Sequence, residues 1–123
     1  MRAITPLVGI VLVALAGCIG DGGPPTCDSA EVTLDLTLTA TELDPTNVDV
    51  CRDQAVTLRI SPEADGLIHI HGYDDEVPAT EVTAGEETVL AFDAARAGQY
   101  PIEFHPADDP AGISVGIFTV HEP

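Results

Sequence analysis

One strictly alternating stretch, EVTLDLTLTATEL over residues 31–43, constrains the fold of this chain more than any other feature. Its apolar side chains are Val32, Leu34, Leu36 and Leu38, and its polar side chains are Thr33, Asp35, Thr37 and Thr39. Successive side chains of a strand point to opposite faces, so this pattern gives one apolar and one polar face. Threonine and β-branched residues are also frequent in it. The stretch is therefore predicted to be a half-buried strand.

Further short segments of the same kind follow, separated by turn sequences about every 8–12 residues. Strands are predicted at 47–50, 55–60, 67–73, just before Ala84-Gly85, and at 88–92, 100–104 and 113–120. After the first 17 residues, no segment keeps a helical period over ten residues. Seven or eight short strands without helices predict an all-β fold, an antiparallel β-sandwich. Cys27 to Val120, roughly 95 residues, is enough for one small domain.

The first 17 residues are expected to be a signal peptide outside the fold. One basic residue, Arg2, precedes an uncharged apolar run of about 14 residues, short of the roughly 20 that a membrane-spanning helix needs. The end of the run, Leu15-Ala16-Gly17-Cys18, resembles the lipobox of bacterial lipoproteins. This resemblance implies that Cys18 is acylated and tethers an exported protein to a membrane, facing the periplasm or the cell exterior. An ordinary cleaved signal with a chance cysteine is the alternative.

Two further cysteines lie beyond the signal segment. Residues 18–30 are expected to hold the acylated cysteine and a flexible linker, because IGDGGPPT is rich in glycine and proline, and the domain is expected at 31–123. With Cys18 acylated, Cys27 and Cys51 form an even pair in an exported protein, where disulfides persist. A Cys27–Cys51 disulfide is expected, worth roughly 3 kcal/mol on the chain-entropy model. A metal role for the pair is the weaker alternative, since neither has a CxxC neighbour or a nearby histidine.

The chain is strongly acidic, with 21 acidic residues, four arginines and no lysine. Loss of the signal peptide would remove Arg2 and leave three arginines against 21 acidic residues, a net charge of −18. Nucleic acids and anionic membrane surfaces are recognised through positive charge, so neither is an expected partner. A saline habitat and simple solubility both account for such a surface.

The order of features in the rest of the chain resembles the cupredoxin fold over about residues 31–120. The resemblance is carried by AVTLRI, by IHIHGYDDEVPATEVTAGEETVLAFDAARAGQYPIEFH, and by a final strand that contains a glycine. These segments look most like exported cupredoxin-like proteins with a His-x-His-Gly-Tyr-Asp strand and a late Glu-x-His. The resemblance implies a Greek-key β-sandwich.

The ligands of a blue copper site are missing from this resemblance. Blue copper proteins of the fold use a histidine from the middle of the chain, with cysteine, histidine and often methionine from the last loop. Here Phe104 stands at the cysteine position after GQYPIE, and the only methionine is Met1. Electron transfer through a blue site is therefore not expected. The HIHG motif also resembles the motifs of multicopper oxidases, but one motif on one small domain cannot build their trinuclear cluster.

Three histidines remain as candidate metal ligands. His69 and His71 share one face of their strand, and the resemblance places His105 at the start of a loop beside that strand. Three imidazoles there suit Cu(II) or Zn(II), with Glu103 or a water completing the shell. The alternative is a metal-free sandwich, in which His69 and His71 face water and His105 binds backbone.

Other polar groups are interpreted as solvated rather than functional. The acidic clusters Asp74-Asp75-Glu76 and Asp108-Asp109 are read as turns, although carboxylates are ligands for hard cations. His121 is expected in a solvated C-terminal tail.

No motif for nucleophilic catalysis or phosphate binding occurs, so the chain is not expected to be an enzyme. The first hypothesis is a membrane-anchored extracytoplasmic lipoprotein that binds copper, or another divalent metal, at a non-blue site, for metal binding or delivery. The rival hypothesis is a metal-free structural or interaction module at the cell surface. The sequence names no protein partner.

Overall fold

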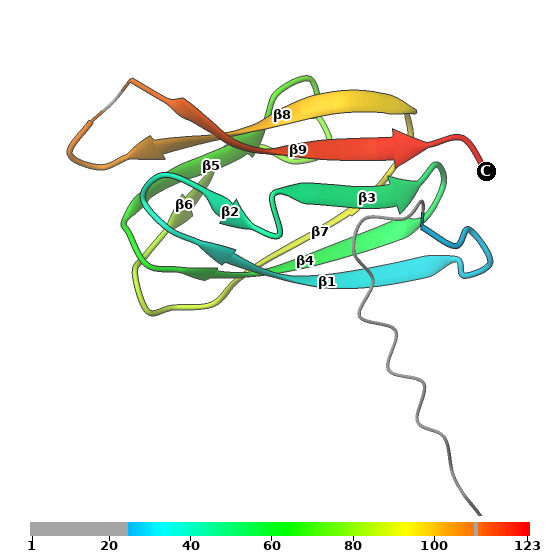
Figure 1. Ribbon diagram of the computed structural model, residues 1–123, viewed down its shortest axis with the longest axis horizontal. Coiled ribbons are helices and arrows are strands. Elements are labelled where there is room, and N and C mark those ends of the chain that lie inside the picture. The colour runs from blue at the N-terminus through cyan, green and yellow to red at the C-terminus, as the bar shows by residue number, and fades with distance from the viewer. Residues whose placement is uncertain (1–24, 110) are drawn as a thin grey trace, which may run out of the picture.

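The computed structural model describes residues 25–109 and 111–123, and within these residues nine strands form a two-layer β-sandwich (Figure 1). The strands are β1 (Glu31–Leu38), β2 (Leu43–Asp44), β3 (Asn47–Cys51), β4 (Ala55–Pro62), β5 (Gly66–Ile70), β6 (Thr80–Val82), β7 (Thr88–Asp93), β8 (Gly98–Pro106) and β9 (Ile113–His121). This part of the chain includes no helix long and apolar enough to cross a membrane. The predicted signal peptide and Cys18 lie outside the described residues.

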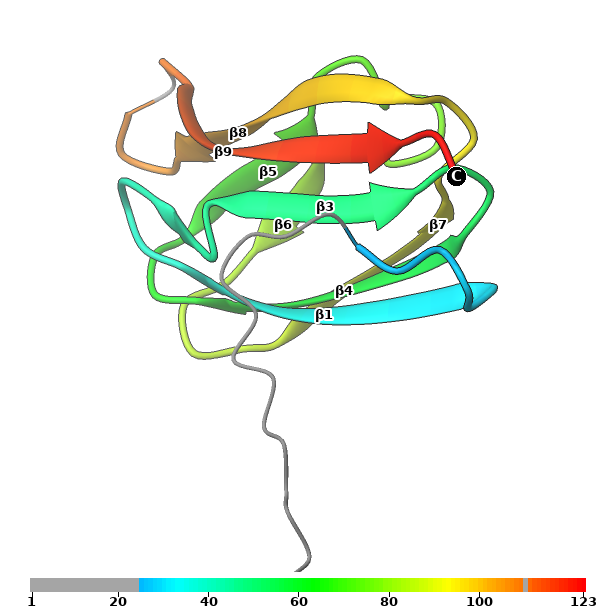
Figure 2. The same ribbon diagram turned by 45° about the vertical axis from the view of Figure 1, so that its right-hand side comes forward.

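The two layers are a four-stranded and a five-stranded sheet (Figure 2). The first has the strand order β2-β1-β4-β7, and the second has the order β3-β9-β8-β5-β6. Most neighbours run antiparallel, but β1 pairs with β4, and β3 with β9, in parallel. The predicted all-β sandwich is confirmed, and each sheet contains one parallel pair that the strand pattern did not reveal.

Side chains from both sheets fill the space between the layers. The alternation predicted for β1 is observed most clearly at its end, where Leu36 and Leu38 are buried and Thr37 is only half-buried. The centre of the core is aromatic, since the Tyr73 ring packs edge-on against Phe92, Tyr100 and Phe118. Each fully buried large apolar side chain contributes about 1.5–3 kcal/mol, so this interior is the main source of stability.

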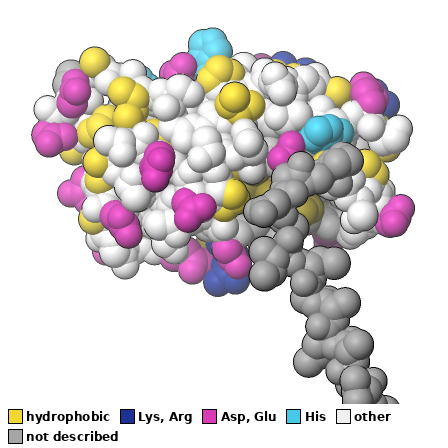
Figure 3. Space-filling view, in the orientation of Figure 1, with side chains coloured by type: hydrophobic (Ala, Val, Ile, Leu, Met, Phe, Trp, Pro, Cys, Tyr) yellow, Lys and Arg dark blue, Asp and Glu magenta, His cyan; other side chains and the backbone are white. Residues whose placement is uncertain are grey.

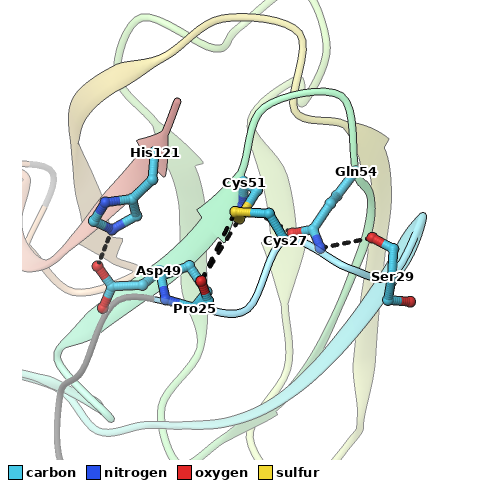
Figure 4. The surroundings of a disulfide bond; sticks show 7 residues. All are labelled: Pro25, Cys27, Ser29, Asp49, Cys51, Gln54 and His121. Carbon is cyan, nitrogen blue, oxygen red and sulfur yellow. Dashed lines mark hydrogen bonds and ion pairs between the residues drawn. A yellow bond between two sulfur atoms is a disulfide. The ribbon is translucent and has the colours of Figure 1, made fainter. Parts of the chain in front are cut away.

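The predicted Cys27–Cys51 disulfide is present and ties the N-terminal segment to the end of β3 (Figure 4). The buried Gln54 side chain reinforces the same junction. Its amide nitrogen donates to the Ser29 carbonyl over 2.8 Å, and its oxygen accepts from the Cys51 backbone N–H over 2.8 Å. Cys27 and Ser29, which precede β1, are therefore fixed to the sandwich by a covalent bond and a buried amide.

Several strand ends differ from the prediction: β1 ends at Leu38 rather than continuing to residue 43, and three other differences concern histidines. β5 ends at Ile70, because the chain turns at Gly72, whose φ of 92° favours glycine, so His71 lies in the turn. β8 continues to Pro106, so the expectation that His105 starts a loop was wrong. β9 continues to His121, which is half-buried and pairs with Asp49 at 2.8 Å, so the predicted solvated tail was also wrong (Figure 4).

Candidate metal centre

Three of the four predicted ligands, His69, Glu103 and His105, lie on β5 and β8, which are antiparallel neighbours in the five-stranded sheet. In their register His69 is directly opposite Glu103, and Leu67 is opposite His105. These four residues point away from the core, since their sequence neighbours Ile68, Ile70, Ile102 and Phe104 are buried. Alternation therefore places His69, Glu103 and His105 together on the outer face of the sheet.

Three ligand atoms from these side chains converge. The Nε2 atom of His69 lies 3.1 Å from Nε2 of His105 and 3.0 Å from Oε2 of Glu103. The same carboxylate oxygen lies 3.9 Å from Nε2 of His105. The two imidazole rings are stacked, with centroids 5.2 Å apart and planes inclined by 23°. Two nitrogens and one oxygen within 4.8 Å of one another are a set that can hold one metal ion.

Asp74 holds the His69 ring from its far side. Its Oδ1 atom lies 3.2 Å from Nδ1 of His69, and its Oδ2 accepts from the Gly72 backbone N–H at 3.4 Å. Burial opposes the ionisation of Asp74, but the hydrogen bonds from Gly72 and His69 outweigh it, and the pKa of Asp74 lies below its usual value. A carboxylate on the second nitrogen of a histidine ligand fixes the ring and strengthens the metal bond.

His71 lies at the rim of this group. Its side chain is 66% exposed, and its Nδ1 is 3.9 Å from Oε1 of Glu103, whereas His69 contacts the other oxygen, Oε2. The backbone N–H of His71 donates to Pro101, which keeps the turn next to β8. His71 therefore approaches the predicted site without joining the three converging atoms.

Gly112 is a feature of the site that sequence reasoning missed. It precedes β9 and lies directly against the His105 ring, so that a methyl group at this position would overlap the imidazole. Its φ is not positive, so the glycine is required here for space rather than for backbone conformation. The glycine lies 40 positions from the HIHG motif in the sequence, and nothing in its local pattern indicated the contact.

The donor set fits a borderline divalent metal and does not fit a blue copper site. Imidazole nitrogens and a carboxylate oxygen are ligands of Cu(II) and Zn(II). No thiolate is available among the described residues, because Cys27 and Cys51 form a disulfide. Phe104, at the position of the blue-copper cysteine, is completely buried in the core. The sequence-based exclusion of a blue site is thus consistent with the side-chain positions.

The remaining polar candidates lie apart from the three atoms or have other contacts. Glu76 pairs with Arg96 at 3.0 Å, and Asp75 is exposed in the turn. The Asp109 side chain accepts a hydrogen bond from the Ala111 backbone N–H. Of the predicted acidic turns, only the first contributes to the site, through Asp74.

Comparisons with known proteins identify the fold. No family model matches the chain, and no curated protein matches it. The solved structures that resemble it include a blue copper oxidase from Nitrosomonas europaea, with a TM-score of 0.59 and 14% identity over 75% of this chain and 39% of that chain. A multi-copper oxidase from Pseudomonas Thermotolerans has a TM-score of 0.56 and 17% identity, over 75% of this chain and 30% of that chain. A third structure, also a multicopper oxidase, has a TM-score of 0.54 and 14% identity over 75% of this chain and 42% of that chain.

These likenesses concern the architecture alone. The identities are low, and the chain spans about a third of the length of the structures that it resembles. The absence of helices in the described residues, the two packed sheets and these likenesses together make the protein an all-β, cupredoxin-like sandwich.

Proposed function

We propose that this cupredoxin-like domain binds one divalent metal ion at a non-blue site made by His69, Glu103 and His105. Copper is the first candidate for this ion. The observation that carries the proposal is the convergence of the three ligand atoms within 4.8 Å on the outer face of one sheet. His71 is a rim residue rather than a ligand of this set, because its Nδ1 is 3.9 Å from the other oxygen of Glu103 and is not among the three converging atoms.

The hydrogen-bonding capacity of the three groups supports a cation between them. A neutral imidazole has one donor and one acceptor nitrogen. When Nδ1 of His69 donates to Asp74, its Nε2 presents a lone pair to a carboxylate oxygen 3.0 Å away. Two acceptors at that distance repel each other unless a positive charge, carried by a proton or by a metal ion, lies between them. A metal ion supplies that charge and also accepts the lone pair of His105.

The choice of copper rests on ligand chemistry and on the fold. Nitrogen and oxygen ligands suit both Cu(II) and Zn(II), but such sites bind Cu(II) more tightly in the Irving–Williams order. The structures of similar fold include proteins described as blue copper and multicopper oxidases. Zinc is the second candidate, because two histidines and a glutamate are also a known zinc ligand set.

The proposed role is metal binding or delivery, without catalysis, in an exported protein tethered through Cys18. The sheet geometry is compatible with such a tether. Cys51 pairs with the end of β9, whereas His105 lies near its beginning, so the disulfide and the candidate site are at opposite ends of the five-stranded sheet.

Titration calorimetry with Cu(II) at high salt tests the proposed site, because salt screens nonspecific attraction to the acidic surface. The unmodified protein should show one saturable site. His105→Ala should weaken it about tenfold or more, because one of three ligands is lost. His121→Ala removes an imidazole that lies outside the site and should leave the affinity unchanged. Equal affinities for the unmodified protein and His105→Ala, or no saturable site, would leave the metal-free sandwich as the better account.

A further inference from the structure

An open groove of about 830 Å³ adjoins the candidate metal centre. It runs along β5 and β6 and past the end of β8, and the imidazoles of both His69 and His105 form part of its wall. A molecule in the groove therefore touches the two residues that would hold the metal. A volume of this size accommodates a small organic molecule rather than only water.

The protein supplies three ligand atoms at this centre, which leaves Cu(II) or Zn(II) short of its usual four or more. The remaining position is filled by water or by another molecule that has a lone pair. Because two of the three protein ligands line the groove, the groove is the direct approach for such a molecule.

The charge of the groove selects among these molecules. Its wall includes the carboxylates of Asp65, Asp74 and Glu81, and no lysine or arginine lies among the residues that line it. A divalent ion beside Glu103 would carry a net charge of about +1, which the three carboxylates exceed. The groove with its metal is therefore negative overall, and it favours cations over anions.

Apolar groups make up the rest of the wall. Leu67, which is 45% exposed, lies between Glu81 and His105 in the sheet. Ala79, Val82, Pro106 and Ala107 line the same groove. Such a lining favours a ligand with an apolar body, because burying it removes hydrocarbon surface from water.

We propose that the groove binds a small organic cation with an apolar body and a neutral nitrogen donor, which completes the coordination of the metal. The inference rests on the proposed metal site and adds its ligand class. The donor nitrogen meets the metal at His69 and His105, and the positive group lies near Asp65 and Glu81.

Three substituted pyridines of different charge test this proposal. 4-(Aminomethyl)pyridine is cationic at neutral pH, 4-methylpyridine is neutral, and pyridine-4-carboxylate is anionic. All three have the same ring nitrogen as donor, and in each the substituent is too far from that nitrogen to chelate the same ion. Each is titrated into the Cu(II)-loaded protein, and binding is followed by the copper d–d absorption and by electron paramagnetic resonance.

The expected order of affinity is cation, then neutral molecule, then anion. At low salt the cation should bind about fivefold or more tightly than the anion. High salt should compress this difference. Asp65→Asn together with Glu81→Gln should also compress it. Glu31→Gln with Asp93→Asn removes the same charge from the other sheet and should leave the order unchanged.

The outcomes separate the two proposals. If Cu(II) binds but none of the pyridines changes its spectrum, the groove inference is wrong while the metal site stands. The inference is equally contradicted if the anion binds as well as the cation, or if both double variants have the same effect. If Cu(II) itself does not bind, the proposed function fails and the inference fails with it.

Discussion

At the scale of single residues, the candidate metal centre depends most on His69, whose two ring nitrogens have different partners. Nδ1 faces Asp74, and Nε2 faces His105 and Glu103. The first contact fixes the orientation of the ring, and the second directs a lone pair toward the other ligands. The quality of the metal site therefore depends on a carboxylate that does not itself join the three ligand atoms.

Asp74→Asn should lower the Cu(II) affinity about tenfold, because the amide keeps the shape of the carboxylate but loses the charge that strengthens His69 as a ligand. The stability of the metal-free protein should change little, since the aspartate is exposed. Calorimetry measures both affinities. Asp75→Asn, which removes a neighbouring exposed charge, is the control. An equal loss in the two variants would mean that Asp74 acts only through the general acidity of the surface.

Gly112→Ala should displace the His105 ring and weaken Cu(II) binding. The added methyl group meets the mobile end of a side chain rather than backbone, so the unfolding free energy of the metal-free protein should fall only slightly. Ala111→Ser adds an atom at the preceding exposed position and serves as the control. Calorimetry and denaturant unfolding separate the two effects. Unchanged copper affinity in Gly112→Ala would show that the ring position does not matter for binding.

The main candidate ligands could be predicted from sequence, but their supporting contacts could not. Histidines at spacing two and a late Glu-x-His show which side chains share a strand face, and the cupredoxin resemblance suggested that His69 and His105 meet. The part played by Asp74 depends on the turn at Gly72, and that of Gly112 depends on how the chain enters β9. Neither contact leaves a periodic signal. His71 was overvalued, because spacing alone does not show where a strand ends.

At the scale of elements, the turn after β5 is held by Tyr73, whose hydroxyl donates to the Arg96 carbonyl and accepts from the Arg96 backbone N–H at 2.9 Å. The Arg96 guanidinium also lies over the Tyr73 ring, 4.6 Å from its centroid. These contacts join the segment after β5 to the segment before β8. They therefore connect the two strands that carry the site through the core as well as through their register.

Burial raises the pKa of Tyr73, and the hydrogen bond to the Arg96 backbone only partly opposes this. An unfolded tyrosine titrates near pH 10, so this group stabilises the fold below about pH 10, and that contribution is lost as pH rises through the higher folded pKa. The free energy of unfolding of Tyr73→Phe should be about 1 kcal/mol lower than that of the unmodified protein at neutral pH. Above pH 10 it should decrease less steeply with pH than that of the unmodified protein.

Chemical denaturation from pH 7 to 11 measures this effect. The only other tyrosine is Tyr100, so Tyr100→Phe is the control and should retain the alkaline loss of the unmodified protein. An identical alkaline slope in the unmodified protein and Tyr73→Phe would show that another group is responsible.

Most strands could be predicted from alternation and turn residues, whereas their pairing could not. The pattern of β1 shows which face is buried, but it carries no information that β4 lies beside it in parallel. The two-residue strand β2 is too short to give a periodic signal. The ends of β5, β8 and β9 depend on neighbouring strands, and these are the places where the histidines were misplaced.

At the scale of the whole molecule, the acidic surface and the β-sandwich have different effects on metal binding at the site. Figure 3 shows acidic side chains across one face of the molecule and few basic ones. This surface raises the local concentration of any cation, without selectivity and in a salt-dependent manner. The sandwich instead fixes three ligand atoms on the outer face of one sheet. Selective metal binding must therefore survive high salt, whereas general attraction does not.

Electron paramagnetic resonance of the protein loaded with one equivalent of Cu(II) at high salt distinguishes a metal centre made by His69, Glu103 and His105 from nonspecific copper binding. We expect a single non-blue copper species with nitrogen couplings from two imidazoles, no intense thiolate-to-copper absorption, and loss of one nitrogen coupling in His105→Ala. A spectrum of free or heterogeneous copper, or one that does not change in His105→Ala, would contradict a metal centre built from His69, Glu103 and His105.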